Sequence, residues 1–307
     1  METIMEEKFE PCGVLIVNKP AGMTSHDVVG AVRRLYHTRK VGHTGTLDPM
    51  ATGVLVVLVG RAAKAAEYLS VHQKSYRAVL RLGLVTDTED VTGQTLATCA
   101  DIPAPDRVTT VASTFTGEIL QTPPMYSALK VNGQKLVDLA RKGIEIERVA
   151  RPITVHALTC THLQNEDYAL EVTCSSGTYI RTLCADIGKA LGCGGAMAAL
   201  DRLSVGDFTL DRAVSPAALA ELSDGERLAL LLPIESLFHD LAAVRLPAFF
   251  EKLCRNGCEI YQKKIGTAHA AGTRVRLCSE NGTFFALGEV REFEGGSAIK
   301  GIKYFDV

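Results

Sequence analysis

The sequence predicts an α+β protein with a second, smaller β-rich domain at its C-terminal end. Apolar runs and alternating segments typical of strands are interleaved with segments whose apolar residues recur at helical spacing. From about residue 247, short strands punctuated by glycine replace the helices. The chain has 307 residues, of which 47% are hydrophobic and 22% charged, the composition of a soluble globular protein of about two domains.

The N-terminal third is expected to contain two strands and two helices. Residues 13–17 form a short apolar strand, and Ser25 suits the N-cap of a helix over 26–36, where apolar residues recur at helical spacing. The unbroken apolar run at 54–59 is typical of a strand covered on both faces, and an alanine-rich helix is expected at 62–70. These elements frame a long loop.

Two alternating segments follow in the middle of the chain. Residues 76–82 and 168–174 place apolar side chains on every second position, which predicts half-exposed strands. A polar turn then leads into a helix over 180–191, whose apolar residues form one stripe. Residues 207–240 are acidic and helical in character.

The C-terminal part has a different sequence pattern, with short strands in place of helices. Pro233 and Pro247 bracket a linker, and one short helix follows it. Further strands are expected at 274–278, 284–287 and 299–305. We therefore divide the chain into a domain over 1–240 and a β-rich domain over 241–307.

The charge balance is informative only when it is resolved along the chain. The net charge is -2, from 33 basic and 35 acidic residues, and taken alone it argues against a nucleic-acid partner. Residues 19–64, however, hold seven basic against two acidic side chains, and residues 123–152 hold six against three. Such local basic surfaces allow contact with RNA phosphates, although a solvated surface helix would explain 123–152 equally well.

Composition also bears on compartment and cofactors. Nine cysteines, an odd number lying mostly in apolar stretches, predict a reduced, cytoplasmic protein. Cys254 and Cys258 lack a second ligand cluster, so no metal site is expected. The acidic residues before position 12 have the wrong sign for a signal peptide, and no apolar run approaches the ~20 residues of a membrane span.

The densest chemistry lies in the loop over 40–53. Three glycines, three threonines and a proline among these fourteen residues let the backbone approach a ligand closely. The loop has neither of the glycine motifs that bind nucleotide phosphates. Pro49 restricts the backbone of Asp48, which is therefore either a catalytic carboxylate or a cap of the turn. His43 has no partner at metal-ligand spacing.

Five motifs in order give the chain a resemblance to a known family. They are 19–25 (KPAGMTS), 42–49 (GHTGTLDP), 121–130 (QTPPMYSALK), 140–143 (ARKG) and 176–181 (SGTYIR). Together they resemble the successive motifs of the TruB family, the bacterial tRNA pseudouridine-55 synthases. The similarity covers essentially the whole first domain.

The resemblance implies a fold and a reaction. The fold is the pseudouridine-synthase catalytic domain, with a mixed, largely antiparallel sheet flanked by helices, plus a small PUA-like C-terminal domain. The reaction converts uridine 55 in the TΨC loop of tRNA to pseudouridine, without cofactor or metal. Asp48 attacks either the uracil ring or the sugar carbon, after the base has been flipped out of the RNA stack.

The resemblance also assigns the neighbours of Asp48. Arg181 is expected to be the counter-ion that keeps this carboxylate ionised, where the helical pattern alone permits a solvated arginine. Tyr76 is placed against the flipped base and Tyr179 beside it, since stacking on an aromatic ring stabilises an extruded base. Periodicity alone would instead assign Tyr76 to the core, because it shares a face with Ala78 and the leucines that follow.

Further contacts follow from the same resemblance. Leu200 lines the pocket, His43 fills the space that the base vacates in the RNA, and Lys19 is a substrate-binding residue of the first motif. The segment 123–152 is an RNA-gripping insertion, and the C-terminal domain contacts the acceptor arm of tRNA. Its candidate phosphate contacts are Lys263, Lys264, Arg274 and Arg276. The enzyme is expected to act as a monomer.

Three positions depart from the family pattern, and two alternatives stay open. Val137 replaces a usual aromatic residue, Met197 a common histidine, and Asp201 a usual arginine beside Leu200. The last departure puts one RNA contact near Leu200 in doubt. The same scaffold could serve a non-catalytic tRNA-binding or tRNA-folding protein, or a synthase that modifies a different RNA uridine.

Overall fold

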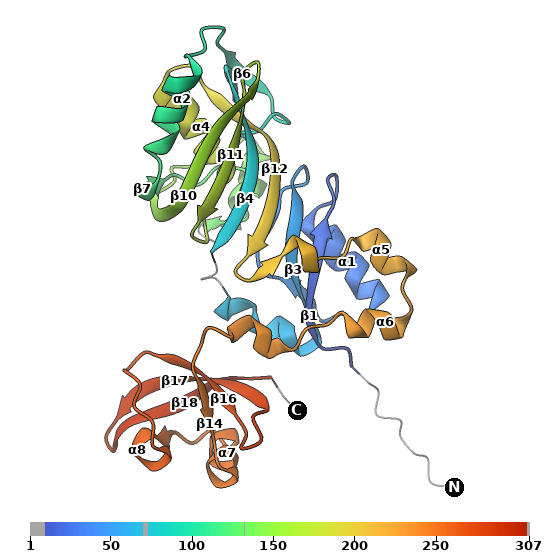
Figure 1. Cartoon of the computed structure of the whole chain (residues 1–307), viewed down its shortest axis with the longest axis vertical. Coiled ribbons are helices and arrows are strands. Elements are labelled where there is room, and N and C mark those ends of the chain that lie inside the picture. The colour runs from blue at the N-terminus through green and yellow to red at the C-terminus, as the bar shows by residue number, and fades with distance from the viewer. Residues whose placement is uncertain (1–9, 70–72, 132, 306–307) are drawn as a thin grey trace.

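The computed structural model describes residues 10–69, 73–131 and 133–305, and these form a nine-stranded sheet and a five-stranded sheet with helices around them (Figure 1). The α+β class and the β-rich C-terminal part are thereby confirmed. Residues 1–9, which hold most of the acidic side chains used above to argue against a leader peptide, lie outside the described residues. No helix in the described ranges is long and apolar enough to cross a membrane.

The large sheet has the strand order β1-β3-β12-β4-β11-β10-β7, with β2 paired to β3 and β13 paired to β12. Its strands are β1 (Gly13–Lys19), β2 (Val41–His43), β3 (Thr52–Val59), β4 (Lys74–Leu82), β7 (Gly117–Gln121), β10 (Arg151–Gln164), β11 (Asp167–Cys174), β12 (Gly195–Val205) and β13 (Phe208–Thr209). The β3–β12 pair is parallel, with Asp201 opposite Thr52 and Arg202 opposite Gly53. The other paired strands described in this sheet are antiparallel.

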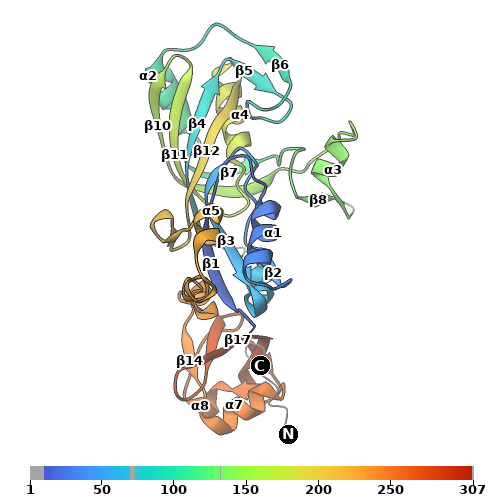
Figure 2. The same cartoon turned by 90° about the vertical axis from the view of Figure 1, so that its right-hand side faces the viewer.

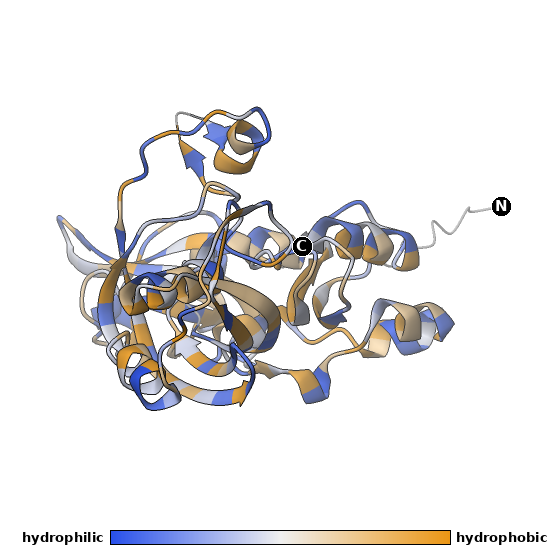
Figure 3. Cartoon of the chain, turned by 90° about the horizontal axis from the view of Figure 1, so that it is seen from above, coloured by the Kyte–Doolittle hydropathy of each residue, from blue (hydrophilic) through white to orange (hydrophobic). Residues whose placement is uncertain are grey.

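The strand patterns explain their places in the sheet. β3 is buried along nearly its whole length, as its unbroken apolar run predicts. β4 alternates, so that Tyr76 and Ala78 are buried while Arg77 and Arg81 are exposed. Coloured by hydropathy, the ribbon changes between orange and blue along many elements (Figure 3), as expected where one face packs and the other meets solvent.

Helix α1 (Ser25–Leu35) packs its valine face against β1 and β3. Its N-cap is Thr24 and not the predicted Ser25. The Thr24 hydroxyl accepts a hydrogen bond from the Asp27 amide, and the Asp27 carboxylate accepts one from the Thr24 amide. This reciprocal capping box requires an acidic residue three positions after the cap, a condition that Thr24 meets and Ser25 does not.

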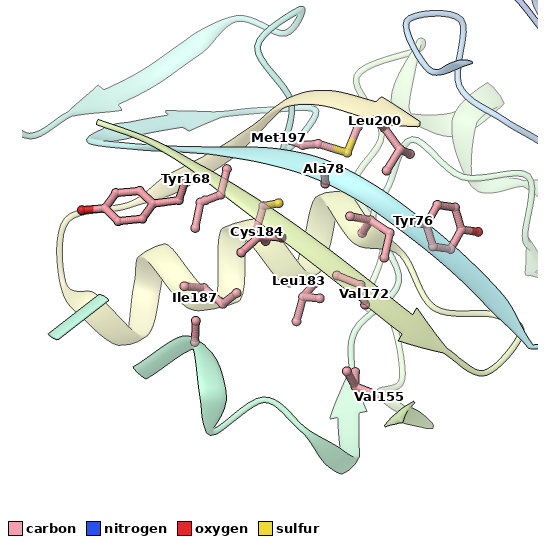
Figure 4. Packing of buried hydrophobic residues seen from close by; sticks show 14 of the residues in the cluster. Tyr76, Ala78, Val155, Tyr168, Val172, Leu183, Cys184, Ile187, Met197 and Leu200 are labelled. Atoms are coloured by element: carbon pink, nitrogen blue, oxygen red, sulfur yellow. The ribbon is translucent and has the colours of Figure 1, made fainter. Parts of the chain in front are cut away.

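Helices α2 (Pro105–Ser113) and α4 (Ile180–Leu191) cover one face of the other half of the sheet. The predicted stripe of α4 is buried, and Figure 4 shows Leu183, Cys184 and Ile187 packing against residues of the strands. The short strands β5 (Leu84–Thr86) and β6 (Thr95–Thr98) form a separate hairpin beyond β4.

The alanine-rich segment winds as a 3₁₀ helix, η1 (Gly60–Tyr68), and not as the α-helix predicted over 62–70. Its inward residues Ala62, Ala65 and Tyr68 are three apart, and a helix with three residues per turn places such residues on one side. The last predicted residue of this helix, at position 70, lies outside the described residues.

The acidic segment is helical, as predicted. It contains η2 (Leu210–Arg212), α5 (Pro216–Glu221), α6 (Asp224–Ala229) and η3 (Ile234–Phe238). The predicted linker between Pro233 and Pro247 is wrong, because η3 fills its first part and β14 (Ala243–Arg245) pairs with β16 in the second sheet. A three-residue strand with one buried side chain, Val244, is too short to give a sequence pattern.

The second sheet has the order β14-β16-β17-β18-β15 and its own apolar core. Its other elements are α7 (Ala248–Arg255), β15 (Ile260–Tyr261), α8 (Gln262–Ile265), β16 (Arg274–Cys278), β17 (Phe284–Phe293) and β18 (Gly296–Tyr304). Leu287 and Phe305 pack in one cluster with Phe238 of η3 and Ala62 of η1. A domain boundary at residue 240 stays a prediction.

The middle of the basic segment over 123–152 stands away from the body of the molecule (Figure 2), while its two ends join the cavity wall and the large sheet. It contains β8 (Lys130–Val131), β9 (Gln134–Lys135) and α3 (Leu136–Ala140), and Figure 2 shows α3 and β8 projecting to one side. A small core of Met125, Leu136 and Leu139 holds these elements together.

Candidate active site

A cavity of about 230 Å³ opens where the loop between β2 and β3 meets β4, β12 and the start of α4. Its volume is several times the ~30 Å³ share of one water molecule, so it has room for a planar base. It is lined by Gly45, Thr46, Leu47, Asp48, Lys74, Tyr76, Tyr126, Ser127, Ala128, Gly177, Thr178, Tyr179, Ile180, Arg181, Leu200 and Arg202. Five predicted site residues therefore meet in one place: Asp48, Tyr76, Tyr179, Arg181 and Leu200.

Asp48 and Arg181 form a two-point ion pair. Arg181 Nε lies 2.9 Å from Asp48 Oδ2, and Arg181 Nη2 lies 3.1 Å from Asp48 Oδ1. The Arg181 side chain is only 6% exposed, so it is not a solvated surface arginine. Its remaining N–H groups donate to the carbonyls of Thr88 and Tyr126, and Asp90 lies 3.8 Å away. This geometry fixes the direction of the Asp48 carboxylate.

The pKa of Asp48 departs from the simple expectation of a carboxylate kept fully ionised by Arg181. Burial raises the pKa of Asp48 above its usual value, and Arg181, the next largest influence, lowers it without cancelling the effect of burial. Asp90 adds a smaller upward contribution to the pKa. The site thus holds a desolvated carboxylate beside one shared cation.

The loop that carries Asp48 is held from beneath. Lys19 is fully buried, and its ammonium donates to the carbonyls of Pro20, Met23 and Pro49. The Ser25 hydroxyl accepts a hydrogen bond from the Leu47 amide at 2.8 Å and also lies 3.1 Å from the Leu47 carbonyl. Lys19 was predicted to contact the substrate. In the structure it lies under the loop and does not line the cavity. Burial lowers its pKa to about 8.

Tyr76 satisfies both interpretations of its position. It is 7% exposed and belongs to the main apolar cluster, yet it also lines the cavity together with Leu200. Figure 4 shows Tyr76 and Leu200 beyond Ala78, toward one end of the packed cluster. The core assignment and the site assignment are therefore not alternatives, because the apolar cluster ends at the cavity.

Tyr179 and His43 are positioned by short polar contacts. The Gln121 side chain donates to the Tyr179 carbonyl at 3.0 Å and accepts from the Tyr179 amide at 2.8 Å, which fixes the residue before α4. The Gly45 amide donates to His43 Nδ1 at 3.3 Å. Burial lowers the pKa of His43 and favours its neutral form. His43 lies at the end of β2, outside the cavity lining.

Two lining residues lie outside both the quoted motifs and the predicted site residues: Lys74 and Arg202. Arg202 is 1% exposed and donates to the carbonyls of Val54 and Gly45 at 2.7 and 3.1 Å. Asp201, which departs from the family pattern, does not disturb Arg202. Its carboxylate accepts a hydrogen bond from the Thr52 hydroxyl at 2.9 Å. The available signal was an arginine in a strand that begins with the apolar run 195–200. The buried hydroxyl of Ser127 has no hydrogen-bond partner among the described residues.

Polar contacts elsewhere bear on two further predictions. Arg276 is a poor phosphate contact, because it pairs with Glu235 at 2.6 Å and donates to the Leu241 carbonyl. Arg274 lies over the ring of Tyr68, with Glu289 3.9 Å away.

Within residues 10–69, 73–131 and 133–305 no group of three or more His, Cys, Asp and Glu side chains is arranged to hold a metal ion.

Comparison with known proteins identifies close relatives. Residues 33–180 match the family model described as TruB family pseudouridylate synthase (N terminal domain), and residues 181–239 match the model described as tRNA pseudouridylate synthase B C-terminal domain. The chain is 44% identical over 258 residues to tRNA pseudouridine synthase B of Alkaliphilus oremlandii, covering 84% of this chain and 86% of the relative. It is 42% identical to the protein of the same name from Aromatoleum aromaticum, covering 90% and 88%.

Solved structures show the same fold. A chain of a Cbf5-Nop10-Gar1 complex superimposes with a TM-score of 0.75 and 26% identity, covering 96% of this chain and 85% of that one. A chain of an H/ACA RNP bound to a substrate RNA containing 2'-deoxyuridine superimposes with a TM-score of 0.72 at 23% identity, over 96% and 85% of the two chains.

Proposed function

The chain belongs to the TruB family of pseudouridylate synthases, and from this premise we propose that it isomerises uridine 55 in the TΨC loop of tRNA to pseudouridine. One observation carries the proposal for this chain's own residues. Asp48 is held by Arg181 at 2.9 Å in a cavity lined by Tyr76, Tyr179 and Leu200. A carboxylate beside aromatic and apolar side chains suits a reaction in which a flipped base is attacked and then turned.

The reaction needs no external group. Asp48 attacks the uracil ring or the sugar carbon, the C1′–N1 bond breaks, the uracil turns, and a C1′–C5 bond forms. The bond between Asp48 and the substrate also breaks, which regenerates the free carboxylate. A proton leaves C5 and N1 ends protonated, so substrate and product have the same atoms. Arg181 orients the carboxylate throughout, and Tyr76 and Leu200 keep the base against the apolar wall while water is excluded.

The partner is a folded tRNA. We infer that the TΨC stem-loop enters the cavity, that the insertion over 123–152 grips the strand, and that the second sheet reaches the acceptor arm. The enzyme acts as a monomer in the cytoplasm. Exposed basic side chains support the grip of the insertion, because Lys135, Arg141 and Lys142 all face solvent.

The decisive experiment uses unmodified tRNA transcripts. Incubation with the protein should produce pseudouridine at position 55, mapped nucleotide by nucleotide, with no added cofactor. Asp48→Asn should abolish product and leave tRNA affinity within about twofold, because the substitution keeps the shape of the side chain. The exposed Asp101→Asn is the matched control and should retain full activity.

Each other outcome supports an alternative. Product at another nucleotide would keep the chemistry and replace the target. Tight binding of tRNA by the wild type without any product would favour a non-catalytic tRNA-binding or tRNA-folding protein. Full activity of Asp48→Asn would remove Asp48 from the nucleophile role.

A further inference from the structure

Two cations of the cavity wall have no counter-ion. Arg181 is neutralised by Asp48 and Asp90, but within the described ranges no carboxylate pairs with Lys74 or Arg202. Arg202 donates to the carbonyls of Val54 and Gly45 and interacts with the Tyr76 hydroxyl, and the Lys74 ammonium makes neither an ion pair nor a hydrogen bond with any described residue. Arg202 is buried and Lys74 is half-buried, and because desolvated charges without a partner are costly, an anion from outside the chain would stabilise the pair.

The two cations converge on one point. A β-carbon placed on Gly45 would lie 3.4 Å from Lys74 Nζ and 3.7 Å from Arg202 Nη1. The space beside this glycine is therefore within reach of both nitrogens at once. Gly45 adds no side chain there, so the space stays open to the cavity.

The electrostatics of the free protein agree with a missing anion. Burial, and after it the nearby Arg202, lowers the pKa of Lys74 to about 8. The groups facing Lys74 are Arg202 from β12, Cys174 from β11 and Tyr76 from its own strand, and none of them is an acid ionised at neutral pH. Two like charges are thus held together without compensation.

We propose that Lys74 and Arg202 bind a phosphodiester of the RNA strand adjacent to the target uridine. This rests on the proposed function, because it takes the nucleotide to enter with its base at Asp48. Tyr76 lines the same cavity as Asp48, Lys74 and Arg202, so a base that stacks on Tyr76 has the reacting carboxylate and the cation pair within one cavity. A nucleotide extends from base through sugar to phosphate. The bound phosphate offsets part of the free energy needed to extrude the base.

The test uses TΨC stem-loops in which one phosphodiester flanking the target uridine, on the 5′ or the 3′ side, is replaced by a neutral methylphosphonate. Lys74→Gln should weaken binding of the unmodified stem-loop about tenfold or more, since a charge-assisted hydrogen bond is lost. One of the two methylphosphonates should weaken wild-type binding by a similar factor and have little further effect on Lys74→Gln. Losses that multiply independently at both linkages would overturn the proposal.

Matched variants separate charge from packing. Lys189→Gln removes the same charge at the exposed far end of α4, roughly 15 Å along the helix from the cavity, and should bind both RNAs as the wild type does. Lys74→Arg should restore most of the affinity. Gly45→Ala keeps both cations and fills the space between them, so it should weaken binding while the thermal stability stays close to that of the wild type.

The pH dependence gives an independent readout. A bound phosphate raises the pKa of Lys74, so wild-type affinity should fall as pH rises from 7 to 9, while Lys74→Gln should show a flatter profile. Lys19 also has a pKa of about 8, and its contribution persists in both proteins. If the wild type makes no pseudouridine, the proposed function fails. If it does, and the pH profile and the methylphosphonate effect are the same in Lys74→Gln, only the phosphate site fails.

Discussion

Asp48 combines two requirements that oppose each other. A nucleophilic carboxylate must be ionised, but a cavity that excludes water disfavours the ionised form. The shared Arg181 offsets part of this cost, and the pKa of Asp48 nevertheless stays above its usual value. A less stabilised carboxylate is the more reactive one, so the incomplete compensation suits a nucleophile.

The acid limb of the pH–rate profile should report this raised pKa. As pH falls, Asp48 takes up a proton before an ordinary aspartate would, so kcat/KM should decline at a pH above the usual 3.8 of this side chain. Arg181→Lys should move the decline to still higher pH, because a lysine loses the two-point contact. Initial rates on tRNA transcripts between pH 3 and 7 measure both; a limb at or below 3.8 would contradict the assignment.

At the scale of elements, the junction of β3 and β12 brings the site together. This parallel pair sets Asp201 and Arg202 beside Thr52 and Gly53, at the end of the loop over 40–53 that carries Asp48. Gly53 has a φ of 104°, and a β-carbon there would lie 2.3 Å from the Arg202 carbonyl oxygen. Only glycine allows the two strands to approach so closely.

Two glycine substitutions test this junction. Gly53→Ala should destabilise the protein by about 3 kcal/mol or more and reduce activity, because both the backbone angle and the contact with Arg202 are unfavourable. Gly22 also has a positive φ, of 84°, but open space around it, so Gly22→Ala should cost only about 1–2 kcal/mol. Urea unfolding measures the difference, and equal losses would show that the close approach is not what requires glycine.

The insertion over 123–152 should act through separate charges. Replacing Lys135, Arg141 and Lys142 together with glutamine should lower the slope of log affinity against log salt by about 2–3, if each contacts one phosphate. Arg148 is unsuitable for this test, because it donates to the Pro123 carbonyl at the base of the insertion. A slope equal to that of the wild type at several salt concentrations would leave the insertion without a role in RNA binding.

Sequence reasoning succeeded where a pattern is local. The alternation of β4, the apolar run of β3 and the stripe of α4 each report burial along one element, and the family motifs locate Asp48 and Arg181. It failed where the cause is tertiary. The pairing of β14, the buried position of Lys19 under its loop and the entry of Arg202 into the cavity depend on neighbours distant in sequence, which no short window contains.

At the scale of the molecule, the second sheet is packed against the first part of the chain. Phe305 is 3% exposed, with its ring 5.8 Å from that of Phe238 and 5.5 Å from that of Phe284. Charge is also unevenly distributed along the chain. The net charge is only -2, but basic residues outnumber acidic ones in 19–64 and 123–152.

Truncation of one aromatic ring tests whether the two sheets unfold together. Phe305→Ala should destabilise the whole chain by about 3–5 kcal/mol and lower its Tm in a single transition. Phe249→Ala removes the same atoms from a side chain that is 66% exposed, and should change Tm little. Calorimetry that resolves two transitions, with only one moved by Phe305→Ala, would instead indicate independently folding domains.

The β3–β12 pairing also constrains when the enzyme can become active during its synthesis. Thr52 and Asp201, which share a hydrogen bond across this junction, are 149 positions apart in the chain. At a translation rate of about 5–20 residues per second, the loop bearing Asp48 leaves the ribosome roughly 8–30 s before the strand that completes its cavity. A nascent chain can therefore expose Asp48 before the cavity around it is complete.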